Sequence, residues 1–249
     1  MKSPGEPATT EETARRHLAA AFRWTARLNM HEGVANHFSA AVSDDGSKFL
    51  LNSVGRHFSR VKASELLLLD ATLAGATEAD PAADRTAWYL HAHLHHRVPR
   101  ARVVLHTHMP YATALACLGD FRFLMLDQNA CRFYDRIGYD RDYSGMFVDD
   151  SEGERVARLL GDNNNVLFLG NHGVLVIGAT VADAFDELYY LEQACKVQVL
   201  ALSTGRPLSL IEDEVASLTC KQWMECTGAE AHFGELLAIL DDDGDEYAS

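Results

Sequence analysis

The sequence lacks an apolar run long enough to cross a membrane. Its longest stretch without a formal charge, residues 163–182, contains four Asn, one His and three Gly, which is too polar for a spanning helix. The first thirteen residues are polar and carry Pro4 and Pro7, so they contain no apolar segment of the secretory type. We therefore expect a cytoplasmic protein.

Positive charge is also scarce. The chain has 22 Lys and Arg against 36 Asp and Glu, which gives a formal net charge of −14 at pH 7. A field of this sign repels phosphate backbones and anionic membrane surfaces. We therefore expect neither nucleic acid nor a membrane as a partner.

Paired cysteines are missing as well. The five Cys residues are odd in number, scattered, and without any C-x-x-C spacing. This pattern favours reduced, buried thiols over a disulfide framework.

Neither an internal repeat nor a Gly/Ser-rich linker divides the 249 residues. Because 47% of them are hydrophobic and 23% charged, the composition is typical of a globular protein. We predict one domain over 1–249, in which roughly eight N-terminal and nine C-terminal residues are tails. The acidic run 241–246 is expected to be part of a solvated chain end.

Apolar periodicity and turn chemistry predict a mixture of helices and strands. The first helix begins at Thr9, whose spacing to Glu12 matches a capping box. Strands at 37–42 and 48–52 flank the turn Asp44-Asp45-Gly46, and the leucine run within 62–70 indicates another buried strand. The other predicted helices are 84–98, 111–118, 151–160 and 180–205, and the other strands are 101–108, 166–169 and 174–178. Residues 71–84 are expected to form a loop, 119–146 loops and short strands, and the last forty or so residues one or two helices.

Two of the twelve histidines, His106 and His108, stand at the end of a predicted strand. Side chains two residues apart in a strand point to the same face, so both imidazoles can reach one ion. His172 lies between two predicted strands in Gly170-Asn171-His172-Gly173, where glycine allows close approach of the backbone. Three neutral imidazoles leave positions open on a divalent ion, which is typical of a catalytic metal site.

The sequence resembles the class II aldolase/adducin family in four stretches, which together span roughly residues 9–202. They are GVANHFSAAV from Gly33, LLNSVGRHFSRVKASELLLLD from Leu50, TAWYLHAHLHHRVPRARVVLHTHMPYATALA from Thr86, and GNHGVLVIGATVADAFDELYYLEQACKVQVLA from Gly170.

The resemblance implies an α/β fold, a three-layer α/β/α sandwich around a mainly antiparallel sheet. It also implies a homotetramer with one divalent metal ion per subunit, held by His106, His108 and His172. Family members include sugar-phosphate aldolases and epimerases, decarboxylases, and adducin-like proteins that have lost the metal histidines. All three histidines are present here.

One departure from the family pattern concerns the catalytic base. Family aldolases carry a Glu nineteen residues before the first metal histidine, and in this chain that position is Ala87. A methyl group cannot accept a proton. Asp84 and His91 lie one helical turn to either side and are candidate substitutes, although Trp88, His91 and His95 also fit a packed helical stripe. His93 and His96 are expected at the surface.

The substrate pocket is also expected to differ from that of the aldolases. Where sugar-phosphate members use small polar residues, this chain has segments that supply bulk and positive charge: Asn36-His37, Gly55-Arg56-His57 and Arg85-Thr86. An arginine binds a carboxylate as well as a phosphate, so these residues indicate a small anionic substrate without identifying the anion. Tyr134, in the irregular region, could donate a proton to a developing alkoxide.

These observations favour a metal-dependent carbon–carbon lyase, and decarboxylation is preferred because it needs no preliminary proton abstraction. Retro-aldol cleavage of a sugar phosphate is the second form. A three-His non-heme iron oxygenase or oxidative decarboxylase, and a non-catalytic adducin-like binding protein, are the alternatives. Zinc is the expected metal, and imidazole ligands also suit manganese, iron, cobalt or nickel.

Overall fold

A computed structural model describes residues 10–73, 80–143, 145, 149–226 and 228–249. Its strands are β1 (His37–Ala41), β2 (Lys48–Leu51), β3 (Leu67–Asp70), β4 (Val103–Thr107), β5 (Ile137–Asp140), β6 (Val166–Leu169) and β7 (Gly173–Gly178). Its α-helices are α1 (Glu11–Arg27), α3 (Arg85–Arg97), α4 (Pro110–Ala116), α5 (Asp150–Leu160), α6 (Val181–Ser203), α7 (Asp213–Glu225) and α8 (Gly228–Asp242). Short 3₁₀ turns are η1 (Phe58–Arg60), η2 (Ala63–Glu65), η3 (Ala130–Phe133) and η4 (Glu246–Ala248).

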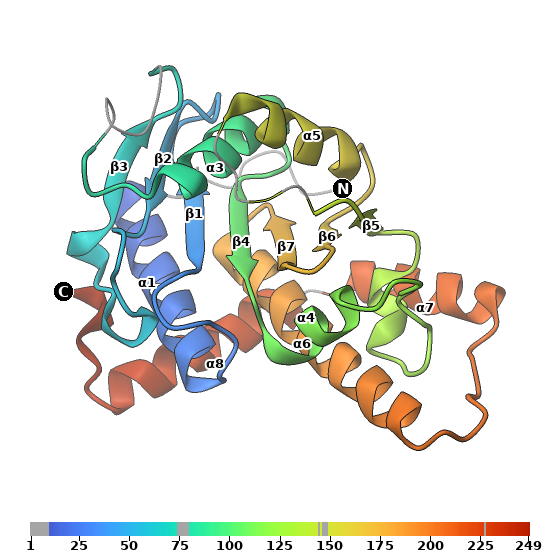
Figure 1. Cartoon of the computed structure of the whole chain (residues 1–249). Coiled ribbons are helices and arrows are strands. Elements are labelled where there is room, and N and C mark those ends of the chain that lie inside the picture. Colours follow the sequence, from blue (N-terminus) through green and yellow to red (C-terminus); the bar gives the residue numbers. More distant parts are fainter. Residues whose placement is uncertain (1–9, 74–79, 144, 146–148, 227) are drawn as a thin grey trace.

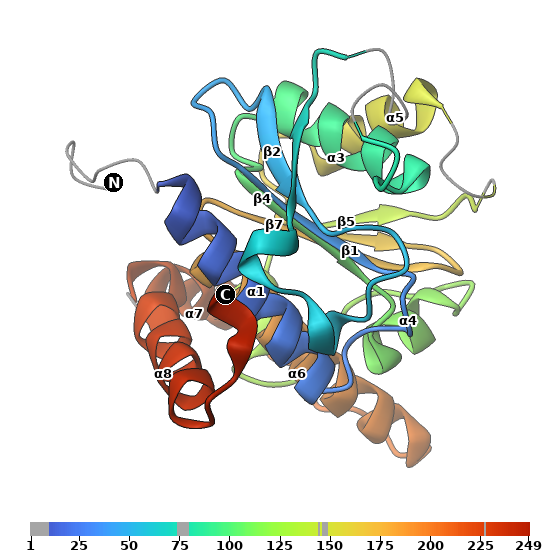
Figure 2. The ribbon, with the colours of Figure 1, turned by 90° about the vertical axis from the view of Figure 1, so that its left-hand side faces the viewer.

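The strands form one sheet in the order β3-β2-β1-β4-β7-β6-β5. Every neighbouring pair is antiparallel except β5 and β6, which are parallel. Figure 2 shows the sheet between two helical layers, with α3 and α5 on one face and α1, α4, α6 and α8 on the other. The expected α/β/α sandwich around a mainly antiparallel sheet is therefore confirmed.

The two faces of the sheet follow from the alternation of side chains along each strand. Phe38 and Leu105 pack in the core below α1 and α6, whereas Val104 packs with Leu90 and Leu94 of α3 on the other face. His37 and His106 are direct partners across β1 and β4, so both side chains project toward the α3 layer. The start of β1, the end of β4, the end of β6 and the start of β7 lie side by side (Figure 1). The histidines at these strand ends are therefore brought together.

Helix starts follow local capping chemistry. Thr180 caps α6 by accepting a hydrogen bond from the Asp183 amide, as its spacing predicts. The first helix is capped by Thr10 and not by Thr9, because the Thr10 hydroxyl accepts the Thr13 amide. Thr9 itself lies outside the described residues, as do the other residues of the expected N-terminal tail.

The leucine run within 62–70 was expected to be a buried strand; the structure confirms a strand there but changes its start and its burial. Residues 63–65 form a 3₁₀ turn, and the strand begins at Leu67. Because β3 is the edge of the sheet, one of its faces is poorly covered and the Leu68 side chain is exposed.

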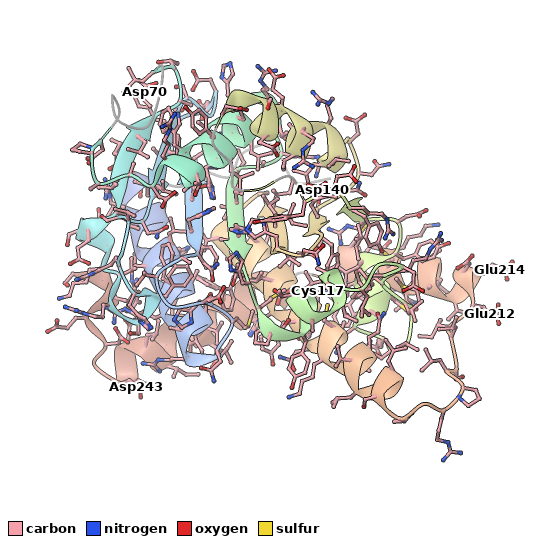
Figure 3. All side chains as sticks on the ribbon, in the orientation of Figure 1. Asp70, Cys117, Asp140, Glu212, Glu214 and Asp243 are labelled. Atoms are coloured by element: carbon pink, nitrogen blue, oxygen red, sulfur yellow. The ribbon has the colours of Figure 1, made fainter. Side chains whose placement is uncertain are left out.

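The acidic C-terminal run 241–246 was expected to be solvated, and all its residues except Asp245 are exposed, but ion pairs also tie it to α1. Arg16 binds Asp241, and Arg27 binds both Asp243 and Asp245, although only the Asp245 side chain is mostly covered. Tyr247 is fully buried, and its hydroxyl donates to Asp241. Figure 3 shows Asp243 where α8 ends and the chain turns back along α1. Long-range ion pairs, which no local pattern encodes, hold this segment in place.

The cysteines are all free thiols, as expected, but their burial differs. Cys131, Cys195 and Cys220 are buried, whereas Cys117 and Cys226 are exposed, which corrects the expectation of uniformly buried thiols. None of the helices in the described ranges is long and apolar enough to span a membrane.

We predict that the C-terminal segment contributes to global stability through Tyr247. The substitution Tyr247→Ala should lower the free energy of unfolding by about 3 kcal/mol, because it leaves a cavity against α1. Denaturant unfolding monitored by circular dichroism measures this change. Asp242→Ala, at an exposed position of the same segment, is the matched control and should change stability by less than about 0.5 kcal/mol. Equal stability of the Tyr247 variant and the wild type would show that the segment only rests on the surface.

Candidate metal centre

The sheet topology brings together the three histidines that were predicted as metal ligands. His106 is in β4, His108 follows its end, and His172 lies in the turn between β6 and β7. One nitrogen from each ring lies within 4.8 Å of the others, and the ring centroids are 4.8 to 5.1 Å apart. Three imidazoles at these separations can bind one divalent ion.

Glycine makes the approach of the His172 turn possible. A Cβ atom on Gly173 would lie 2.7 Å from the Thr107 carbonyl oxygen and 2.8 Å from Cδ2 of His108. A Cβ atom on Gly170 would lie 2.9 Å from the Asp140 carbonyl oxygen. Asn171 between them has φ of 55°, a left-handed conformation that asparagine tolerates better than most residues. The glycine-flanked loop thus allows the close backbone approach that the sequence suggested.

In two of the three rings, a hydrogen bond made by Nδ1 leaves Nε2 as the nitrogen that can bind a metal ion. His106 Nδ1 donates to the Val174 carbonyl oxygen at 3.0 Å, and His108 Nδ1 donates to Glu32 Oε2 at 2.5 Å. In its neutral form each ring therefore presents an unprotonated Nε2, and His108 Nε2 is buried without a hydrogen-bond partner in the described part of the chain. A metal ion satisfies such an atom, so the residues fit a bound divalent cation.

Burial keeps two of the candidate ligand rings, His106 and His172, neutral. Desolvation lowers the pKa of His106 well below its usual value, and it lowers the pKa of His172 to about 4. Asp140, at the end of β5 in Figure 3, partly opposes the shift at His172. A neutral imidazole is the form that binds metal, so these two rings do not need to lose protons near pH 7.

Asn36 organises the loop that carries Glu32. Its Oδ1 accepts hydrogen bonds from the Glu32 amide at 2.7 Å and from the Thr107 hydroxyl at 3.3 Å. Its Nδ2 is buried and has no partner in the described ranges. Asn36 was predicted to bind substrate, and here its oxygen is used to position the Glu32 carboxylate against His108.

Behind the metal histidines, a chain of hydrogen bonds runs into the protein. His37 Nδ1 lies 2.7 Å from His91 Nε2, and His91 Nδ1 bonds Ser39 Oγ. Ser39 Oγ lies 2.6 Å from His95 Nε2, and His95 Nδ1 lies 2.8 Å from the Ala101 carbonyl oxygen. The His37 ring packs on the His106 ring with centroids 4.7 Å apart. The His37 ring thus lies between His91 and the candidate metal ligands, and both ring nitrogens of His91 have hydrogen-bond partners.

The candidate substitutes for the absent glutamate occupy different positions. Asp84 is the N-cap of α3, and its Oδ1 accepts the amides of Thr86 and Ala87 and the Thr86 hydroxyl. Burial opposes its ionisation, but these hydrogen bonds and nearby His37 lower its pKa overall. Ala87 packs in an apolar cluster with Phe49 and Trp88. The space at position 87 is therefore part of the core and not a polar pocket.

Of the predicted arginines, one is neutralised and one is exposed. Arg56 forms a two-pronged ion pair with Glu65, in the turn that Gly55 makes with φ of 72°. Arg85 is exposed at the first residue of α3 and lies over the Tyr89 ring. Thr86 uses its hydroxyl on Asp84. Arg85 is thus more available than Arg56 to bind an anion, whereas the Thr86 hydroxyl is bound to the N-cap residue of α3.

Tyr134 is not brought to the metal histidines within this chain. It precedes β5, whose Ile137 pairs with the start of β6, whereas His172 follows the end of β6. Its carbonyl oxygen accepts a hydrogen bond from Cys220 of α7. Because β5 runs parallel to β6, it is Asp140 at its far end that comes near His172, and Tyr134 is separated from the site by the length of the strand.

Sequence reasoning missed Glu32 and Ser39. Ser39 is two residues after His37, so the period of a strand would have placed both on one face. Glu32 lies in a loop, and its approach to His108 depends on the Asn36 hydrogen bonds, for which the sequence carries no periodic signal. His93 is half-buried and His96 exposed, close to the expected surface positions.

Comparison with known proteins identifies the family. Residues 16–199 match the family model described as the class II aldolase and adducin N-terminal domain. The chain belongs to this family.

Individual relatives include enzymes of different names. The chain is 30% identical to decarboxylase NovR of Streptomyces niveus over 205 residues, 82% of this chain and 75% of that protein. It is 29% identical to a 4-hydroxy-3-prenylphenylpyruvate oxygenase/4-hydroxy-3-prenylbenzoate synthase of Streptomyces roseochromogenus subsp. oscitans, over 82% of this chain and 73% of the other. A crystal structure of an aldolase II superfamily protein from Pseudomonas syringae superposes with a TM-score of 0.86 at 31% identity, covering 99% and 98% of the two chains.

We predict that Glu32 strengthens metal binding through His108. Glu32→Gln removes the carboxylate that orients the ring and should weaken zinc affinity by roughly tenfold or more. Competition with a chromophoric chelator measures this affinity. Glu214→Gln, at an exposed position of α7, is the control and should bind zinc as the wild type does. Unchanged affinity in the Glu32 variant would mean that the short contact to His108 has no role in the site.

Proposed function

We propose that this chain is a divalent-metal-dependent carbon–carbon lyase that decarboxylates a small anionic oxygenated substrate. One observation carries the proposal: the three-histidine cluster is retained while Ala87, in an apolar cluster, takes the place of the family base. Its membership of the aldolase and adducin family and its similarity to a decarboxylase support the same class.

His106, His108 and His172 would hold the ion, and a bound divalent ion supplies Lewis acidity toward a substrate oxygen. In decarboxylation, the bond to the carboxylate carbon breaks, carbon dioxide leaves, and the electron pair stays on the remaining fragment until a proton is added. This order of steps needs no base at the start of the reaction. It therefore suits a site in which the position of the glutamate is filled by packing against Phe49 and Trp88.

Retro-aldol cleavage of a sugar phosphate is less well supported. It begins by removing a proton from a hydroxyl, and the candidate bases next to Ala87 are committed elsewhere. Asp84 caps α3 through Oδ1, and both ring nitrogens of His91 have partners. We therefore keep decarboxylation as the first form of the proposal.

An oxygen-dependent reaction is the second candidate. The similarity to a relative named as an oxygenase favours it, because three histidines can also hold iron(II) with open positions for other ligands. An adducin-like binding role is disfavoured by the complete histidine cluster.

The expected oligomer is a homotetramer, as the family resemblance implies. Apolar side chains exposed on α6 and α7 offer surface for subunit contacts: Val197, Leu200, Leu202, Val215, Leu218 and Met224. Size-exclusion chromatography with light scattering tests this assembly.

We predict that the purified, untagged protein holds close to one metal ion per chain. His106→Ala/His172→Ala should lose it, because one remaining imidazole cannot hold a divalent ion in the site. Mass spectrometry of the metal content measures this, and His96→Ala, at an exposed position of α3, is the control. Zinc or manganese would favour the lyase and iron the oxygenase. Absence of bound or rebindable metal would contradict both.

Activity distinguishes the two enzymes directly. Carbon dioxide release should be followed for a panel of small 2-oxo and 2-hydroxy acids, in air and under anaerobic conditions, with the loaded protein and the double variant. The lyase releases carbon dioxide equally in both atmospheres, whereas the oxygenase stops without oxygen. Turnover by the double variant would contradict the metal-dependent proposal.

We predict that Arg85 contributes more than Arg56 to binding the anion. Arg85→Gln should raise KM by about tenfold with little change in kcat, because it removes a charged hydrogen-bond donor from the start of α3. Arg56→Gln is the matched comparison, since its guanidinium is already bound by Glu65. A larger effect at Arg56 would place the anion in the Gly55 turn instead.

A further inference from the structure

The buried chain of hydrogen bonds behind the metal centre has a fixed direction. It runs from His37 through His91, Ser39 and His95 to the Ala101 carbonyl oxygen. A carbonyl oxygen can only accept, so His95 must carry its proton on Nδ1. If the ring is neutral, His95 Nε2 is then an acceptor and must receive the hydroxyl proton of Ser39.

The same logic passes from Ser39 to His37. Because the Ser39 hydroxyl donates to His95, its oxygen accepts from His91, which therefore carries its proton on Nδ1. His91 Nε2 is then an acceptor, and His37 Nδ1 must be the donor at 2.7 Å. Burial lowers the pKa of His95 to about 4 and that of His91 well below the usual value, which keeps both rings neutral.

The free end of this chain faces the metal histidines. His37 Nδ1 is committed to His91, so Nε2 is the remaining polar atom of the ring. The ring lies on His106, and Asp84, His108 and His172 are close enough to influence it electrostatically. A neutral His37 presents an unprotonated Nε2 beside the site.

We propose that the Ala101 carbonyl oxygen, acting through His95, Ser39 and His91, fixes His37 with its proton on Nδ1, so that His37 Nε2 is a hydrogen-bond acceptor for a substrate hydroxyl at the metal centre. His91, Ser39 and His95 are positioning residues in this arrangement. His37 is a specificity residue, which selects a hydroxylated anion over the corresponding anion without a hydroxyl. This inference rests on the proposed function only in that it needs the metal site.

The direction of the hydrogen-bond chain can be measured without an activity assay. In the metal-free full-length chain labelled with ¹⁵N-histidine, long-range ¹⁵N–¹H correlation spectra distinguish protonated from unprotonated ring nitrogens. We expect a single tautomer with the proton on Nδ1 at His37, His91 and His95. A wild-type His37 with its proton on Nε2 would overturn the inference.

Two variants test the coupling along the chain. Ser39→Ala removes the link between His91 and His95, so His37 and His91 should no longer be held in one tautomer. His91→Gln can keep the direction, because its amide oxygen accepts from His37 and its NH₂ group donates to Ser39, and His37 should stay protonated on Nδ1. His96→Gln, on the exposed side of α3, is the control and should change neither. An unchanged His37 tautomer in the Ser39→Ala variant would contradict the inference. If Ser39→Ala does not fold, the His91→Gln variant still tests it.

The selectivity is tested with glycolate and acetate, which differ by one hydroxyl group, as probes of the zinc-loaded protein. Isothermal titration calorimetry should give a preference for glycolate that falls by about tenfold in His37→Phe and in Ser39→Ala, because one hydrogen bond is lost. The His96→Gln control should keep the full preference. Full zinc binding with an unchanged preference in both variants would contradict this inference alone. Failure of the wild type to bind zinc, with the tautomers as expected, would instead contradict the proposed function.

Discussion

The candidate site depends on the antiparallel pairing of β4 with β1 and β7. This pairing sets His37 opposite His106 and brings the β6–β7 turn, with His172, next to the end of β4. A shift of either register by one residue would turn His106 toward the α1 layer and separate it from its partners. The positions of the candidate metal ligands are therefore specified by strand register, and the two packed faces of the sheet determine that register through their apolar side chains.

Much of this arrangement could be predicted because it is local. The spacing of His106 and His108 in a strand, the glycines around His172, and the caps of the helices are encoded within a few residues of each other. The long helix after Thr180 and the β6 strand follow directly from such patterns. Family resemblance extended these local predictions to the order of the layers.

The missed features depend on contacts between distant segments. Glu32 reaches His108 across 76 residues, and Ser39 reaches His95 across 56 residues, so neither spacing has a local signature. The docking of the C-terminal run likewise depends on Arg16 and Arg27 of α1, more than 210 residues away. Such a run resembles a solvated end until its partners are known. The role of Tyr134 stays a prediction; within this chain it lies at the start of β5, away from His172, because β5 runs parallel to β6, a direction that cannot be read from its sequence.

The replacement of the family glutamate is best understood together with the packing around it. Ala87 is fully buried beside Phe49 and Trp88, and the helix that carries it also presents His91 and His95 to Ser39 on β1. A carboxylate at position 87 would lie against apolar side chains, where an unpaired charge is costly. The polar groups beneath the metal histidines are instead imidazoles and a hydroxyl, neutral and joined to a backbone carbonyl oxygen. In the arrangement that we propose, the α3 layer orients a neutral acceptor at the site, and a reaction that begins with loss of carbon dioxide needs no carboxylate base there.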